Sequence, residues 1–275
     1  MESWKQKGVL FLVSFGVSLG ADFDTNNSLI EFYGKSDSRI NIVIKDNIDI
    51  EGKITSAGSV ALNDNKASSN AFLIQKLIDA NFNIAGKANL SEWANFRSEN
   101  SVSGWSSKGG QTTHVLNSKY NPCGSSSGSA VAVASGLVDI AIGTETNGSI
   151  SCPSSINGII GFKPTVGLVS RSGIIPISSS QDTAGPMGKT LEIVAKTLEV
   201  ISGYDPNDKA TSFIPEDFNF NFVDVTNNRR LDGIRFGLLN ADNQHPQVIE
   251  FHNEIKAIVK KLGGEVIDIK DDRIY

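Results

Sequence analysis

Two clusters of serine and glycine, separated by ordered sequence, constrain the fold of this chain more than any other feature. The clusters lie at residues 124–129 and 147–151. Between them, small residues at 129–135 predict a short, closely packed helix, and the apolar run 137–142 predicts a buried strand. Flexible linkers also have this composition, but a linker does not lead into a core strand. We therefore expect both clusters to be loops at the ends of rigid elements, where catalytic groups are usually mounted.

The composition is that of a globular protein and argues against several classes of function. Of 275 residues, 39% are hydrophobic and 20% charged, and the net charge of −5 comes without a basic stripe, so no nucleic-acid partner is expected. Cys123 and Cys152 are the only cysteines. Each lies at one of the two clusters rather than in a spaced framework, which favours neither a disulfide scaffold nor a zinc site, and we expect no metal.

Residues 1–21 have the pattern of a secretory signal peptide. Lys5 and Lys7 precede an apolar run, and the small residues Gly20 and Ala21 suit a cleavage point. The run is too short to span a membrane comfortably, so no stable membrane insertion is expected. The alternative is a buried strand or helix at the start of the domain. A signal peptide predicts a secreted or periplasmic protein, and without one the chain would be cytoplasmic.

Apolar strands alternate with amphipathic helices along much of the chain. Residues 22–39 are polar and predict a connector, 89–115 are irregular, and 166–177 predict a strand and a turn. This alternation predicts an α/β fold with a mixed, mostly parallel β-sheet flanked by helices. The expected strands are 40–44, 83–87, 158–162, 231–240 and 265–270, and the expected helices are 70–80, 190–202 and 246–262.

A catalytic serine in these loops would need a base, and the histidines are poorly placed to serve as one. His114 falls in the irregular segment, and His245 and His252 fall at the start of the last helix. Lysine replaces histidine when burial lowers its pKa. Lys45, at the end of the strand 40–44, is the best placed lysine, although a lysine at a strand exit is usually a surface charge.

Four separated motifs resemble those of the amidase signature family, serine amidohydrolases that cleave carboxamide bonds. They are IKDNI at 44–48, PCGSSSGS at 122–129, GTETNGSI at 143–150 and GFKPT at 161–165. Their order makes the match far more specific than any single motif. The amino-acid sequence of these motifs is most similar to that of the peptide amidase branch, which deamidates C-terminal peptide amides.

The resemblance implies the amidase signature fold and a Ser-Ser-Lys triad that works without a metal or organic cofactor. Ser149 matches the nucleophile, Ser125 the bridging serine and Lys45 the general base, and the bond between Gly124 and Ser125 matches a cis peptide. The implied reaction converts a carboxamide to a carboxylate and ammonia through an acyl-enzyme on Ser149. The implied oxyanion hole consists of the backbone N–H groups of Thr146, Asn147, Gly148 and Ser149.

The chain departs from the family in its length. Members are usually much longer, so we expect residues 22–275 to hold the N-terminal and central parts of an amidase domain, incomplete at both ends and without its C-terminal part. Two alternatives stay open. One is a truncated, inactive relative that acts as a binding or structural module, and the other is a glutamine-using amidotransferase subunit. The expected partner is a small-molecule or peptide amide, and its identity and the oligomeric state are left open.

Overall fold

The computed structural model describes residues 24–227, 230–239 and 244–269, and the predicted signal peptide lies outside this part of the chain. The chain divides into two compact units, Met1–Val223 and Asp224–Tyr275. Within the described residues, the larger unit contains a six-stranded sheet and a two-stranded hairpin, and the smaller unit contains a two-stranded sheet. The predicted active-site residues all belong to the larger unit.

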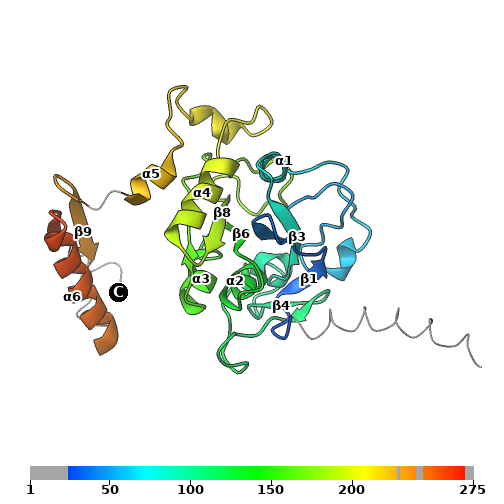
Figure 1. The fold of residues 1–275 in the computed structure, drawn as a ribbon. Helices are drawn as coiled ribbons and strands as arrows, with labels where there is room; N and C mark the ends of the chain where they lie inside the picture. Colours follow the sequence, from blue (N-terminus) through cyan, green and yellow to red (C-terminus); the bar gives the residue numbers. More distant parts are fainter. Residues whose placement is uncertain (1–23, 228–229, 240–243, 270–275) are drawn as a thin grey trace, which may run out of the picture. The chain divides into compact units, whose positions relative to one another are not determined.

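The larger unit is built on a sheet with strand order β1-β3-β2-β6-β8-β7 (Figure 1). At its centre β3, β2 and β6 run parallel, and β1, β8 and β7 add antiparallel pairs on either side. This mixed sheet with flanking helices confirms the predicted fold class. The strands are β1 (Leu29–Phe32), β2 (Asn41–Lys45), β3 (Asn83–Ala88), β6 (Ile140–Glu145), β7 (Ile160–Gly161) and β8 (Thr183–Gly188), and a separate hairpin pairs β4 (Trp105–Ser106) with β5 (Gly110–Gln111).

Helices cover both faces of this sheet because its central strands are apolar on both faces. Successive strand residues point to opposite faces, so the run Ile42, Val43 and Ile44 needs apolar cover on each side. Ile42 and Ile44 pack with α1 and α4, whereas Val43 packs with α2. The helices are α1 (Phe72–Asp79), α2 (Ser127–Ala134), α3 (Ser151–Ile156) and α4 (Leu191–Ile201), with 3₁₀ turns at Val60–Leu62, Glu92–Asn95 and Lys209–Phe213.

Three segments differ from the sequence-based expectation. β1 forms within the predicted connector 22–39, where it is a partly buried edge strand with a bulge and so lacks clear alternation. β8, TAGPMG, was not predicted because glycine and proline replace the usual strand formers. Gly185 belongs there because a Cβ would lie 2.1 Å from Phe162 O. The predicted strand within 166–177 forms only the isolated bridges Ile48–Ile174 and Val169–Ser202.

The smaller unit is a strand, a helix and a second strand, as predicted. β9 (Arg235–Leu239) and β10 (Glu265–Ile269) pair in parallel, and α6 (Pro246–Lys261) connects them. Pro246 begins α6, and the His245 side chain accepts a hydrogen bond from the Gln247 N–H. The boundary between the units falls within α5 (Phe222–Asn227). Within the described ranges, the helices are too short or too polar to cross a membrane.

Gly128, in the first turn of α2, allows that helix to touch two backbone segments at once. A Cβ at Gly128 would lie 2.2 Å from Ser28 O and 2.4 Å from Asn89 O, and these backbone atoms cannot move aside cheaply. We expect Gly128→Ala to lower the free energy of unfolding by about 1 to 3 kcal/mol. Urea denaturation would measure this, with the exposed Lys196→Ala of α4 as a control expected to stay within about 0.5 kcal/mol of the parent. An unchanged midpoint for Gly128→Ala would contradict this packing.

Candidate active site

Lys45 ends β2 inside the protein, with a fully buried side chain. Its Nζ lies 2.7 Å from Ser125 Oγ, 2.9 Å from Thr144 Oγ1 and 3.2 Å from Thr144 O. The general expectation that a lysine at the end of a strand is a solvated surface charge is therefore wrong for Lys45. β2 and β6 are adjacent parallel strands, so Lys45 and Thr144 lie at the same end of the sheet.

The surroundings of Lys45 favour an uncharged amine. Burial lowers the pKa of Lys45 from 10.5 to about 7, against the opposing charges of Glu145 and Asp182. A neutral amine has two N–H groups and one lone pair, which matches its three neighbours. The N–H groups can donate to Thr144 O and Oγ1, and the lone pair can accept the hydroxyl proton of Ser125.

Ser125 reaches Lys45 from the loop that leads into α2. The bond between Gly124 and Ser125 is cis. Ser125 is fully buried, and its carbonyl accepts a hydrogen bond of 3.0 Å from Ser91 N–H. A Cβ at Gly124 would lie 2.3 Å from Ser91 Oγ, which explains a glycine at this position. Lys45 and Ser125, 80 residues apart in the sequence, are thus brought together.

Ser149 lies on the second loop, next to the first. Its carbonyl accepts a hydrogen bond of 3.1 Å from Ser126 N–H, so the backbones of the two loops are joined one residue beyond Ser125. Ser149 is partly exposed and stands two residues before α3. Among the described residues, its hydroxyl makes no hydrogen bond. The structure therefore joins the two serine loops through the backbone and leaves the Ser149 hydroxyl unengaged.

Glu145, the last residue of β6, shapes the loop that carries Ser149. Its carboxylate accepts hydrogen bonds from the N–H groups of Gly148 at 2.8 Å, Ile150 at 2.7 Å and Ser151 at 2.8 Å. Burial acts to raise the pKa of Glu145, but donation from these N–H groups outweighs it and leaves the pKa lowered. Glu145 was not among the site residues predicted from the sequence. An acidic residue between a strand and a Gly/Ser loop at a helix start is the signal that points to it.

This hydrogen-bond pattern changes the predicted set of oxyanion donors. The Gly148 N–H is already given to Glu145, so it is not available to a substrate oxygen. The N–H groups of Thr146, Asn147 and Ser149 have no acceptor among the described residues. The side chain of Thr146 fixes its position, because its hydroxyl donates a hydrogen bond to Asp182 Oδ1 at 2.6 Å. Of the four N–H groups predicted to form the oxyanion hole, three therefore remain available, and the Gly148 N–H does not.

Two cavities adjoin this end of the sheet. One, of about 310 Å³, is lined by Thr144, Thr146, Arg171 and Asp182 among others, and the second, of about 290 Å³, is mainly apolar, with Trp93 and Phe96 in its wall. Asn47 lines both. Its Nδ2 donates to Thr144 Oγ1 at 3.0 Å, whereas its buried Oδ1 has no hydrogen-bond partner in the described part of the chain. Asn47 thus offers one unused acceptor beside the predicted base.

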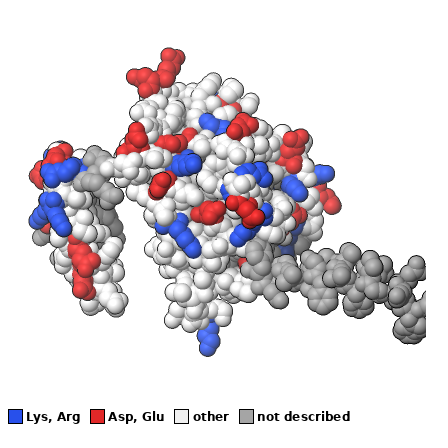
Figure 2. Space-filling view, in the orientation of Figure 1, with Lys and Arg blue, Asp and Glu red and all other residues white. Residues whose placement is uncertain are grey.

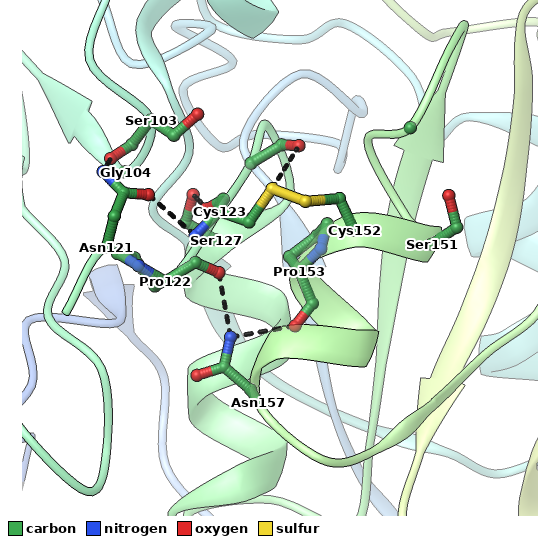
Figure 3. Close-up of a disulfide and its surroundings, with 12 residues drawn as sticks. Ser103, Gly104, Asn121, Pro122, Cys123, Ser127, Ser151, Cys152, Pro153 and Asn157 are labelled. Carbon is green, nitrogen blue, oxygen red and sulfur yellow. Dashed lines mark hydrogen bonds between the residues drawn. A yellow bond between two sulfur atoms is a disulfide. The ribbon is translucent and has the colours of Figure 1, made fainter. Parts of the chain in front are cut away.

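Cys123 and Cys152 form a disulfide, which was not expected from the sequence (Figure 3). Their Cα atoms lie 5.9 Å apart although 29 residues separate them in the sequence. The pairing arises because α2 leads away from the first loop and β6 returns the chain to the second. The expectation of no disulfide is wrong because it rested on the spacing of the cysteines along the sequence, whereas the fold brings the ends of the two loops together. Neither cysteine is then a free thiol.

The histidine nearest to these loops in the sequence is committed elsewhere. His114 is buried, its Nδ1 accepts a hydrogen bond from Leu116 N–H, and its Nε2 lies 3.0 Å from Ile156 O. Both ring nitrogens therefore serve the backbone. On the face of the molecule in Figure 2, acidic and basic side chains are interspersed, and the described residues form no continuous basic surface there.

Comparison with known proteins agrees with the resemblance seen in the sequence motifs. The Amidase family profile matches residues 39–274. The chain is 42% identical over 235 residues to a putative amidase of Arthroderma benhamiae, covering 84% of this chain and 40% of that protein. It is 38% identical over 233 residues to one subunit of the glutamyl-tRNA(Gln) amidotransferase of Trichodesmium erythraeum, covering 82% of this chain and 46% of that subunit.

A solved structure agrees with these sequence matches. Native peptide amidase from Stenotrophomonas maltophilia matches 94% of this chain with a TM-score of 0.82 and 40% identity, and the match covers 57% of the peptide amidase chain. This chain thus spans roughly 40 to 57% of the length of the three proteins. Motif order, fold and family profile agree over more than half of its length, and the chain belongs to the amidase signature family.

Proposed function

We propose that this chain carries the catalytic residues of a serine amidohydrolase that converts a carboxamide to a carboxylate and ammonia. The observation that carries the proposal is the contact of 2.7 Å between a buried lysine, Lys45, and Ser125, on a loop whose backbone is bonded to that of Ser149. Burial penalises the charged form of a lysine, and Lys45, unlike Lys87, has no ion-pair partner among the described residues, so a neutral amine acting as a base is the role that we infer for it.

The proposed reaction begins with proton transfer along the triad. Neutral Lys45 takes the proton of the Ser125 hydroxyl, and Ser125 takes that of Ser149 as Ser149 Oγ attacks the carbonyl carbon. The C–N bond then breaks, the departing nitrogen receives the proton back through Ser125, and ammonia leaves an ester on Ser149. Water, deprotonated by the same path, cleaves the ester and releases the carboxylate.

Negative charge on the carbonyl oxygen needs donors during the attack. The N–H groups of Thr146, Asn147 and Ser149 are the unengaged donors of the loop, and we assign the oxyanion hole to them. A single donor of this kind commonly contributes about 3 to 4 kcal/mol to transition-state stabilisation. Glu145 would support them indirectly, because its bonds to Gly148 and Ile150 fix the loop.

The substrate we propose is a C-terminal peptide amide or a similar small amide. The mainly apolar cavity beside Asn47 suits an uncharged group, and Asn47 Oδ1 offers an acceptor to a substrate N–H. The similarity to peptide amidase favours the same substrate class. Because the chain is also similar to the glutamyl-tRNA(Gln) amidotransferase subunit, glutamine is the alternative substrate to compare with the peptide amide.

Ammonia release tests the function directly. The purified chain would be incubated with an N-blocked dipeptide amide, with glutamine and with the free acid of the dipeptide as a blank. Preferential deamidation of the dipeptide amide is the expected result. Preference for glutamine would assign the amidotransferase role. A folded chain that releases no ammonia and resists a fluorophosphonate probe would be the inactive relative.

The reactivity of Ser149 is expected to depend on pH through Lys45. The neutral amine is the active base, and it predominates above a pKa of about 7. The rate of fluorophosphonate labelling should therefore be low near pH 5, rise with a midpoint near 7 and level off above about pH 8. Lys45→Arg should remove both the reactivity and this rise, because arginine stays protonated. A rise with the same midpoint in Lys45→Arg would assign it to another group.

We also propose that the chain acts outside the cytoplasm. Disulfides persist mainly in oxidising compartments, and the pattern of residues 1–21 is that of a secretory signal. Expression in a secreting host should give a mature N-terminus near Gly20 or Ala21 in the exported fraction, as read by mass spectrometry. Retention of the full N-terminus in the cytoplasm would contradict export.

A further inference from the structure

We propose that the Cys123–Cys152 disulfide positions the two catalytic serines, and that its reduction lowers the reactivity of Ser149 while the sheet stays folded. The inference rests on the proposed function for the roles of Ser125 and Ser149. It assigns Cys123 and Cys152 as positioning residues, because neither needs to touch the substrate.

The disulfide closes a ring of chain that contains both serines. Cys123 stands two residues before Ser125, and Cys152 stands three residues after Ser149, in the first turn of α3. Between them the ring contains α2 and β6, which are packed into the core. The bond therefore joins the start of the first loop to the first turn of α3, which follows the second loop.

The backbone at Cys123 needs to be held in place. Its φ is +58°, in the left-handed region that residues other than glycine rarely occupy. The Asn121 side chain accepts a hydrogen bond from Cys123 N–H at 2.8 Å, and Ser127 Oγ donates to Cys123 O at 2.5 Å (Figure 3). The disulfide is the covalent restraint on the same residue. Without it, only these two hydrogen bonds hold Cys123 in this conformation, and a change there would shift Gly124 and Ser125, which follow it directly.

Other bonds between the loops would survive reduction. Ser126 N–H still donates to Ser149 O at 3.1 Å, and Asn157 Nδ2 bridges Pro122 O at 2.9 Å and Pro153 O at 2.8 Å (Figure 3). These contacts keep the loops together, so the expected change is local. It affects the alignment of Ser125 with Ser149 rather than the fold.

A reductant can reach this bond. Cys123 and Cys152 are both partly exposed, unlike the buried Ser125. A dithiol would break the S–S bond by thiolate exchange, leaving one thiol on each cysteine and a disulfide in the oxidised reductant. Removal of the reductant and addition of an oxidised dithiol would reverse the step.

The test compares oxidised and reduced protein, with thiols counted by alkylation and mass spectrometry. Reduction should slow fluorophosphonate labelling of Ser149 by about tenfold or more, since small misalignment of reacting groups has effects of this size, and reoxidation should restore it. Amide hydrogen exchange should speed up in residues 123–127 and 148–152 and stay unchanged in β2 and α4. The exchange measurement needs no catalytic activity.

Two variants separate the restraint from other effects of reduction. Cys123→Ser/Cys152→Ser should label as slowly as reduced parent and be insensitive to dithiol. Cys123→Gly/Cys152→Ser should recover part of the labelling rate, because glycine accepts a positive φ without the covalent restraint.

Each outcome decides the proposal. Unchanged labelling and unchanged exchange in fully reduced protein would overturn it, as would loss of protection in β2, which would mean global unfolding. If oxidised parent does not label, the proposed function fails, and faster exchange confined to the two loops would still support the positioning role of the disulfide.

Discussion

Replacement of Ser149 by alanine is expected to abolish amide hydrolysis, with a fall in kcat of about 10⁴-fold or more. Neighbouring nucleophiles in the described part of the chain are already engaged. Cys123 and Cys152 are consumed in the disulfide, and the buried Ser125 hydroxyl faces Lys45. The oxyanion donors would remain in the variant, so any residual rate would come from binding and charge stabilisation alone.

Mass spectrometry of fluorophosphonate-treated protein would test this assignment at the level of the residue. The parent should gain one probe on the peptide that contains Ser149, and Ser149→Ala should gain none. Ser155→Ala is the matched control, because it removes an exposed hydroxyl from α3 in the same region and should label like the parent. Label on Ser125 in the parent, or a full rate in Ser149→Ala, would reverse the roles of the two serines.

The features that the sequence predicted well are those with a local physical signature. The run Ile42–Ile44 is apolar on both faces and became a central strand, and the motifs on either side of α2 became loops at strand and helix ends. The placement of Lys45 at the end of a strand, within the first of the four motifs, was predictable from the sequence. Its burial was not, because an isolated lysine at the end of a strand has the same sequence signature whether or not it faces solvent.

The features that were missed depend on backbone direction and on distant pairing. The role of Glu145 follows from three N–H groups that converge on one carboxylate, and only the turn of the loop brings them together. The disulfide follows from the return path through α2 and β6. β8 forms because β6 and β7 pair with it, against the weak strand propensity of glycine and proline.

The second large effect is expected for stability, at a buried ion pair beside the base. Lys87 Nζ lies 3.3 Å from Asp46 Oδ1, with side-chain exposures of 0% and 2%, and Asp46 directly follows Lys45. Lys87 Nζ also donates to Ile48 O at 2.6 Å. Burial lowers the pKa of Lys87, and the charge of Asp46 opposes this shift. The ion pair therefore holds Asp46 in place at the end of β2, directly after the predicted base Lys45.

Lys87→Met is expected to lower the free energy of unfolding by about 3 to 5 kcal/mol, because it leaves the buried carboxylate of Asp46 without its cation. Methionine has a similar length and fills the same space, so the loss should not come from a cavity. Urea denaturation followed by circular dichroism would measure the change. A loss below about 1 kcal/mol would mean that Asp46 is compensated by its other donors, the Ser56 hydroxyl and the Ser56 and Gly58 N–H groups.

A double variant distinguishes the unpaired charge from lost packing. Asp46→Asn keeps an oxygen that can accept from Ser56 and Gly58 but removes the charge. In Lys87→Met/Asp46→Asn no charge is left unpaired, so this variant should be more stable than Lys87→Met alone, with a coupling of about 0.5 to 3 kcal/mol. Strictly additive losses would contradict the ion-pair explanation. Recovery of stability together with the parent rate of Ser149 labelling would show that the pair supports the strand exit and takes no part in the chemistry of Lys45.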